Sequence, residues 1–460
     1  MGELVASKSK RERLAPKKNP FKSFLYWAIS VFALKLIVLF NIQGGNIEIS
    51  GRPFLLDSIW LGADGENYIT GFDALSREGV FSEVGILNYW PAGYPLFLLF
   101  LSTFGKSWVF ASLAIVQSAI FSWATYSFAK QLLRTRLKNF SYLIFLLILL
   151  NPTLSLSSLA VGYESLAASG FLLSAALISQ DLIEENESRF KWRLITVSAI
   201  FGFLTFIQPR LVLSGVLVIL IWLIVRKGLR LTMILMAVSL AITLFFPATL
   251  VYRNNQATGV STVSNNLGNT MNLGAGDKAT GGYGSKEAGV ECNVENRTDN
   301  DLVKCVFKWY LENPSKSLQL FYNKSIYFWS PWFGPEANGT MARNPWLKIN
   351  PVKNITSTQE GVDLVYGGFG KLISWVWLLS GIGLLLYGFK FLWQQKSLER
   401  FLASMAMTIV LTNWLVSLIS IGDHRFRLPI MGMSLFLQAI GLKALFKGKK
   451  PLMVDGPALR

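Results

Sequence analysis

Two carboxylates, Asp64 and Glu66, follow the first long apolar run of the chain and are separated only by Gly65. Ionisable side chains at membrane depth are rare and tend to mark a pathway or a site. A carboxylate held there can act as a general base, accepting the proton of a hydroxyl group while that hydroxyl attacks an activated donor. Tyr68 lies one helical turn after Asp64 and could contribute to the same site. The alternative is that both acids are ordinary solvated members of an acidic loop.

A second group of polar residues lies near the C-terminus, where Arg425 and Arg427 flank Phe426 and follow Asp423 and His424. The planar guanidinium fork matches the geometry of phosphate, and few acids stand nearby in the sequence to neutralise the two arginines. We therefore expect Arg425 and Arg427 to bind an anion. His424 is the only histidine in the chain, and both a catalytic and a structural role are open for it.

Three further charged residues, Glu164, Arg210 and Arg253, fall at the ends of apolar runs. Each has a structural alternative, because a glutamate can cap a helix and an arginine can extend its charged end to the lipid headgroups. If these ends face the same side of a membrane as Asp64 and Arg425, all of them would surround one outward-facing cavity.

The elements that must position these residues are membrane spans. Of 460 residues, 52% are hydrophobic and only 15% are charged, against about 25% charged in soluble domains. Apolar runs of about 20 residues, enough to cross a ~30 Å hydrocarbon core, predict an all-α polytopic membrane protein. We predict about ten crossings, at residues 24–41, 107–129, 140–157, 166–180, 194–208, 211–225, 231–251, 371–393, 401–420 and 428–446. Residues 94–104 are too few to span and predict an interfacial or re-entrant helix.

The distribution of lysine and arginine sets the orientation, because cytoplasmic loops are enriched in both. The two terminal segments and the turns at 130–138, 189–193, 226–230 and 390–400 carry 25 of the 44 basic residues. The loop at 42–91 carries two basic and seven acidic residues. We therefore expect both termini in the cytoplasm, the 42–91 loop outside, and the chain in a plasma (inner) membrane. The net charge of +17 then reflects topology and attraction to membrane lipids, and nucleic acid is not implied.

This topology divides the chain into a basic cytoplasmic tail (1–23), an N-terminal transmembrane module (24–251), an extracytoplasmic segment (252–370), C-terminal transmembrane helices (371–446) and a second cytoplasmic tail (447–460). The segment 252–370 is too long for an idle connection, so we expect a partly ordered cap or binding element. Both cysteines of the chain, Cys292 and Cys305, fall in it. An oxidising outer compartment allows them to form a disulfide, and two free thiols are the alternative.

Motifs spread along residues 50–430 resemble, in order, those of the GT-C glycosyltransferases, in particular the bacterial branch related to protein mannosyltransferases and to lipid A aminoarabinose transferase. The matching pieces are the acidic first-loop motif at 64–68, the Trp-Pro and Tyr-Pro element at 90–98, Asn151 and Pro152 with Glu164, the segment 252–268, Asn313 and Pro314, and the arginine–aromatic–arginine motif at 425–429. The chain departs from the family pattern in two places. Gly65 separates the acidic pair, and Arg210 stands one position beyond the usual basic residue.

The resemblance implies an inverting glycosyltransferase that moves a sugar from a polyprenyl-phosphate donor to a glycan, lipid or protein acceptor at the outer membrane face. It implies Asp64 or Glu66 as the general base, with Asp64 favoured through its spacing from Tyr68. The implied substrate-binding residues are Tyr68, Glu164, Arg210, Arg253, His424, Arg425 and Arg427. No cofactor is required, although a divalent cation bridging Asp64, Glu66 and phosphate is compatible with these residues. A transporter or flippase for a lipid-linked or anionic substrate is the alternative, but no internal repeat of the kind common in transporters is evident.

Overall fold

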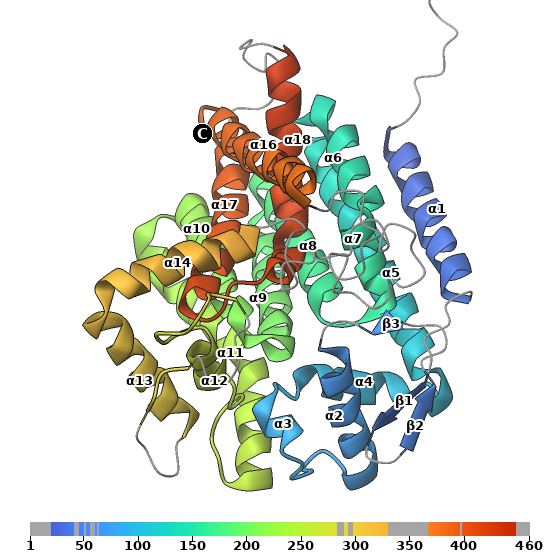
Figure 1. Ribbon diagram of the computed structural model, residues 1–460. Helices are drawn as coiled ribbons and strands as arrows, with labels where there is room; N and C mark the ends of the chain where they lie inside the picture. Colours follow the sequence, from blue (N-terminus) through green and yellow to red (C-terminus); the bar gives the residue numbers. More distant parts are fainter. Residues whose placement is uncertain are drawn as a thin grey trace, which may run out of the picture.

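The computed structural model describes residues 20–40, 46–49, 52–55, 60–61, 64–282, 289–292, 298–329, 367–395 and 398–447. Within these residues, long helices form a bundle, and the short helices and strands of the first outer loop gather at one end of it (Figure 1). One apolar core, to which nearly every long helix contributes, runs through the bundle. His424 lies in a described helix, but its side chain lies outside the described part.

Ten helices of the described part coincide with the ten predicted crossings. They are α1 (Pro20–Phe40), α5 (Val109–Leu132), α6 (Lys138–Leu150), α8 (Glu164–Glu184), α9 (Glu187–Ile207), α10 (Val212–Lys227), α11 (Leu229–Thr258), α16 (Gly367–Trp393), α17 (Leu398–Ile419) and α18 (Met431–Lys447). Eight spans in the described residues are long and apolar enough to cross a membrane, or nine if α6 and the bent segment after it form one span. In α16 the apolar stretch found is shorter, Leu378–Trp393. The all-α polytopic class is therefore confirmed, and the count of ten stays a prediction.

The third predicted crossing, 140–157, is bent rather than straight. The chain turns by 55° between α6 and the helical segment that follows, which comprises α7 (Pro152–Leu156) and the 3₁₀ helix η2 (Ser157–Leu159). Pro152 has no N–H to continue the helix, and it disfavours the helical conformation of the residue before it. Asn151 is accordingly extended, and its side-chain oxygen accepts a hydrogen bond from the Leu154 N–H at 2.9 Å. The bent segment leads through β4 to Glu164 at the start of α8.

The first outer loop forms three short helices, α2 (Gly65–Glu78), α3 (Ile86–Tyr89) and α4 (Gly93–Ser102). It also forms the antiparallel pair β1 (Asn46–Ile49) and β2 (Arg52–Leu55), and β3 (Trp60–Leu61), which pairs in parallel with β4 (Ala160–Val161). The all-α prediction missed these strands, because two to four residues are too few for an alternating pattern. The apolar α4 agrees with the short helix predicted at 94–104. Gly93 lets it approach α9 closely, since a Cβ there would lie 2.0 Å from the carbonyl oxygen of Phe206.

The segment after α11 forms an outer cap of three helices, α12 (Leu267–Leu273), α13 (Asp299–Glu312) and α14 (Pro314–Trp329). α11 continues to Thr258, seven residues past the predicted boundary at 251, and ends where Gly259 adopts the left-handed conformation. A disulfide joins Cys292 to Cys305, and a small apolar core forms around Met271, Val306 and Tyr310. The segment is thus ordered in helices up to Trp329, and its extracytoplasmic placement stays a prediction; residues 330–366 lie outside the described residues.

Ion pairs tie together the ends of α8, α9 and α10 that the charge distribution places in the cytoplasm. Asp181 of α8 is buried, and its carboxylate lies 3.5 Å from Arg193 of α9 and 3.3 Å from Arg226 of α10. Trp222 donates its indole N–H to the same carboxylate at 3.2 Å. Basic residues that signal the topology therefore also hold the bundle together, because removing one partner of a buried pair leaves a charge without compensation.

Candidate functional site

Asp64 and Arg425, far apart in the sequence, form an ion pair beside the start of α2. The Arg425 Nη2 lies 3.1 Å from the Asp64 Oδ2, and the two side chains are only 10% and 12% exposed. Asp64 stands at the N-terminus of α2, and Arg425 lies in the 3₁₀ helix η6 (His424–Ile430), which leads directly into α18. Asp423 caps η6 by accepting the Arg425 backbone N–H at 2.9 Å. The two residues predicted to line one cavity are therefore in direct contact, and the cavity itself stays a prediction.

Backbone pairing brings the Asp64 loop beside the segment that carries Glu164. The parallel pair of β3 and β4 joins Trp60 to Ala160 and Leu61 to Val161. Behind β4, the hydroxyl of Tyr94 accepts the Gly162 N–H at 2.9 Å and donates to the Gln117 side chain at 3.3 Å. These contacts link the first outer loop to α5 and α8. The pairing of β3 with β4 thus fixes the Asp64 loop relative to the Glu164 segment, and the sequence alone did not predict this pairing.

Glu164 begins α8 and lies among the same charges. Its carboxylate interacts electrostatically with Arg425, Asp64 and Arg210. The side chain folds back over Gly162, where a Cβ would lie 2.4 Å from the Glu164 Oε2, so a larger residue at 162 would displace it. The preceding Tyr163 is buried, and burial, followed by the charge of Glu164, raises its pKa. Glu164 therefore belongs to the site and is not merely a helix cap.

The hydroxyl group of Tyr68 lies near this cluster and is available to bind a ligand. Its ring is buried and packs on Tyr94, with ring centroids 4.6 Å apart. No residue in the described part of the chain forms a hydrogen bond with its hydroxyl. Burial raises the pKa of Tyr68 well above its usual value, and Asp64 raises it further, so the phenol remains protonated. Such a group can donate a hydrogen bond to an oxygen of a bound ligand.

The other basic residues support η6. The guanidinium of Arg210 lies 3.7 Å from the centre of the Phe426 ring and donates to the Ser417 hydroxyl at 3.1 Å. A cation over an aromatic ring stabilises both groups, so Arg210 fixes the residue between the two arginines of η6. Arg427 is partly buried and interacts with Asp423. Arg210 is thus near the site, and its observed contacts position η6.

Glu66 and Arg253 are not brought into this cluster. Glu66 lies in the first turn of α2, one residue past Gly65, and is exposed. Arg253 donates to the carbonyl oxygens of Val80, at 2.9 Å, and Ser82, and to the Asn88 side chain at 3.0 Å. It therefore fastens the end of α11 to the loop before α3. The expected phosphate-binding role of Arg253 finds no support in these contacts, because its guanidinium is occupied by that loop.

Two buried lysines near the site were missed in the sequence. Lys35 of α1 donates to the Ser158 hydroxyl at 3.0 Å and lies 4.3 Å from the centre of the Phe121 ring. A lysine inside an apolar run is itself a signal of a buried polar partner. Lys324 of α14 donates to the Leu418 carbonyl at 2.9 Å and to the Tyr310 hydroxyl at 2.7 Å. It therefore fastens the cap to the end of α17, which stops at Ile419, four residues before Asp423 of the site segment.

Protonation of Lys324 should make the attachment of the cap depend on pH. Burial lowers the pKa of Lys324 to about 7, from 10.5 for a free lysine. Between these two values the unfolded cap binds more protons than the folded one, so stability rises with pH across this window and is level below it. We expect hydrogen exchange in α14 to slow, once corrected for intrinsic exchange rates, as the pH is raised from about 7 to about 9.

The Lys324→Met variant should lose this pH dependence, whereas Lys316→Met should keep it, because Lys316 is an exposed lysine on the same helix. Equal pH dependence in wild type and Lys324→Met would refute the assignment. Hydrogen exchange followed by mass spectrometry of α14 peptides measures all three proteins in the same way.

The carboxylates of Asp64 and Glu66 lie in different surroundings. In the described ranges no three His, Cys, Asp or Glu side chains come together as ligands would. Asp64 is engaged with Arg425, and Glu66 is exposed. A divalent cation bridging Asp64 and Glu66, which the sequence allowed without requiring, is not supported by the positions of the two side chains.

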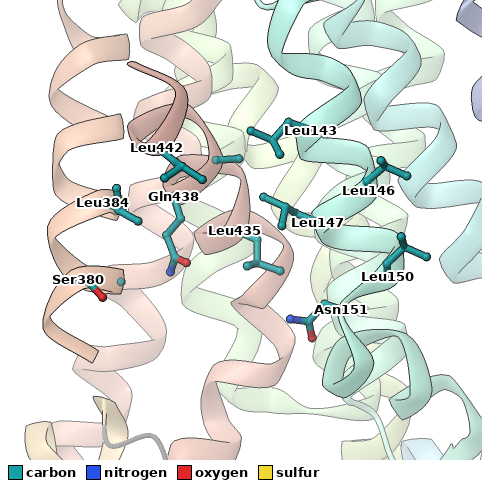
Figure 2. Close-up of a pocket in the computed structure, with 12 residues that line it drawn as sticks. Leu143, Leu146, Leu147, Leu150, Asn151, Ser380, Leu384, Leu435, Gln438 and Leu442 are labelled. Carbon is teal, nitrogen blue, oxygen red and sulfur yellow. The ribbon is translucent and has the colours of Figure 1, made fainter. Parts of the chain in front are cut away.

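An apolar groove lies in the membrane-spanning part of the same bundle, between α6, α16 and α18. It has a volume of about 540 Å³. Figure 2 shows leucines of α6 facing Leu384 of α16 and Leu435 and Leu442 of α18, with Asn151 where α6 ends. Gln438 and Ser380 supply the other polar side chains of its wall. α18 follows η6 directly, so one continuous segment connects the groove with Arg425.

A scan of the chain against protein-family models found no match, and searches of curated proteins and of solved structures found none either. The fold and its composition define the chain as a multi-pass α-helical membrane protein with a buried, mixed-charge cluster at one end of the bundle.

Proposed function

We propose that the protein is a glycosyltransferase that moves a sugar from a polyprenyl-phosphate carrier to an acceptor hydroxyl at the outer membrane face. The observation that carries this proposal is the buried ion pair of Asp64 and Arg425, with Glu164 and Tyr68 beside it. It places a group that can accept a proton next to a group that can hold a phosphate. The ordered motifs resembling GT-C enzymes support the same function.

In the proposed reaction, the acceptor oxygen forms a bond to the anomeric carbon while the bond from that carbon to the phosphate oxygen breaks. The electron pair leaves with the phosphate, and Asp64 takes the proton of the acceptor hydroxyl. Arg425 stabilises the charge that grows on the departing phosphate. Attack opposite the leaving group inverts the anomeric carbon. The phosphate is already a stable anion, so the reaction needs no strong general acid.

Binding of the donor phosphate would also free the carboxylate of Asp64 to act as the base. A phosphate on Arg425 competes for the guanidinium N–H groups that Asp64 now accepts. The carboxylate is then released toward the acceptor. This order predicts that proton removal follows donor binding. Tyr68 can donate its hydroxyl to a sugar or phosphate oxygen, and Arg210 keeps η6 in place through Phe426.

The groove between α6, α16 and α18 fits the tail of such a carrier. Its wall is mostly leucine, which suits an isoprenoid chain. Leu435 follows Arg427 by eight residues, or about 12 Å at 1.5 Å per residue. The polar head of a carrier at η6 and its tail in the groove are therefore compatible with one extended lipid molecule.

Transfer can be tested with the full-length protein in proteoliposomes and a panel of radiolabelled polyprenyl-phosphate sugars. Envelope lipids, glycans and proteins would serve as acceptors. We expect one donor to give a labelled product whose anomeric configuration is inverted. Movement of label across the bilayer without a covalent product would instead indicate a transporter or flippase. Retention of configuration would contradict the direct-attack mechanism.

A further inference from the structure

The helices α13 and α14 of the outer cap extend to one side of the bundle, and α14 runs crosswise to α17 and α18 (Figure 1). Each carries two large apolar side chains, one helical turn apart, that no part of the described protein covers. Phe307 is 45% and Leu311 82% exposed on α13, and Leu318 is 68% and Tyr322 63% exposed on α14. Exposed large apolar side chains grouped in this way mark a surface for a partner or for a membrane.

The exposed face is separate from the face that folds the cap. On α13, Val306 and Tyr310 point into the small core with Met271, and the disulfide at Cys305 fixes the helix to the segment before it. On α14, Leu320 and Phe328 are buried. The four exposed side chains are therefore not needed for the internal packing of the cap. Contact with a partner or with lipid would account for their exposure.

Contacts with α17 fix the depth of α14. Ser325 accepts the indole N–H of Trp414 at 3.2 Å, and the rings of Trp329 and Trp414 are 6.2 Å apart. Trp414 lies five residues before the end of α17 at Ile419, which is about 7.5 Å inside that end at 1.5 Å per residue. Tryptophans concentrate where the hydrocarbon meets the headgroups. These contacts set the C-terminal half of α14 beside the last turns of α17, the level at which tryptophans concentrate in membrane proteins.

From these positions we propose that the joined helices α13 and α14, called the hairpin below, insert their exposed side chains Phe307, Leu311, Leu318 and Tyr322 into the outer leaflet of the bilayer. Lys304 and Lys308 flank Phe307 and are exposed. Lysines beside apolar residues place their stems on the apolar surface and their ammonium groups at the lipid phosphates. Glu312 and Asp277 pair with Lys308 and Lys316, so the hairpin carries little net charge and depends mainly on its apolar face.

This insertion has a consequence for the site. Lys324 and Tyr310 of the hairpin contact the last carbonyls of α17, and Gly422 donates its N–H to Gly281 at 2.9 Å just before Asp423. A hairpin anchored in the outer leaflet would thus hold η6 at a fixed height above the hydrocarbon. The inference concerns the membrane and does not depend on the proposed transfer reaction.

The test uses single nitroxide labels on full-length protein in vesicles of phosphatidylethanolamine and phosphatidylglycerol. Both native cysteines are joined in a disulfide, so an introduced thiol is labelled selectively. Leu311→Cys and Leu318→Cys are the test positions. Leu415→Cys, exposed on the spanning helix α17, is the lipid control, and Gln256→Cys, exposed near the outer end of the long helix α11, is the water control.

We expect oxygen to relax the labels at 311 and 318 as strongly as at 415, and a water-soluble nickel chelate to relax them much less than at 256. Accessibility to nickel equal to that at 256 would overturn the proposal and assign the face to a partner in the aqueous phase. The Lys324→Met variant, labelled at 318, adds a second measurement. Loosening the hairpin from α17 should leave the label in lipid if the bilayer holds this face, and move it to water if only α17 does.

Discussion

Replacing Asp64 with asparagine is expected to reduce kcat by about 10²- to 10⁴-fold, the range that general-base catalysis contributes. The KM for the lipid-linked donor should fall at the same time, because phosphate no longer has to displace a carboxylate from Arg425. Asparagine has nearly the same size, so the fold of α2 should persist. Initial rates measured over a range of donor concentrations would give both constants.

The matched control is Glu66→Gln, which removes a carboxylate two residues away on the exposed side of the same helix. It should leave kcat within about a factor of two, as surface substitutions rarely exceed 0.5 kcal/mol. If Glu66→Gln is inactive and Asp64→Asn is active, the base is Glu66 and the site described above is wrong. If both are active, neither Asp64 nor Glu66 takes the proton, and Glu164 becomes the candidate.

Replacing Arg425 with glutamine is expected to raise the donor KM by about 10- to 100-fold, since hydrogen bonds to charged groups contribute about 1.5–3 kcal/mol each. The same change should lower stability by up to about 3–5 kcal/mol, because Asp64 would be left buried without its partner. Thermal unfolding in detergent and donor saturation in vesicles measure the two effects separately.

The double variant Asp64→Asn with Arg425→Gln should recover much of the lost stability without recovering activity, because it removes both charges of the pair. Arg77→Gln is the matched control. It breaks another arginine–aspartate pair in the outer loop, with Asp73, one turn apart on α2 and more exposed on the arginine side. A donor KM that rises equally in Arg77→Gln and Arg425→Gln would show that the effect is general destabilisation rather than loss of a phosphate ligand.

The membrane class could be read from the sequence because a bilayer imposes a simple requirement: about 20 apolar residues in one helix. Each predicted crossing falls on a helix for that reason. The positions where prediction failed depend on backbone details that apolarity does not encode. Pro152 bends the third crossing, and Gly259 rather than the end of apolarity terminates α11. The two-residue strands β3 and β4 join the loop before α2 to the segment before α8.

For the site, the sequence alone identified which charged residues are unusual, since charges at the ends of apolar helices are costly unless they have partners. It could not assign those partners. Asp64 and Glu66 look alike in the sequence, yet the pitch of α2 turns Glu66 to the surface while Asp64 meets Arg425. Arg253, expected at the phosphate, is occupied by backbone carbonyls of the loop before α3.

The sequence by itself therefore determined the class of protein and the set of charged residues worth examining. Both depend on the free energy of transferring side chains out of water, which residue type alone sets. What only the tertiary structure decided was the pairing within that set, and the roles of Lys35 and Lys324, which the sequence did not single out. Such pairings join residues hundreds of positions apart, and they depend on helix rotation and loop register at the scale of one residue. No local pattern of residue types carries that information.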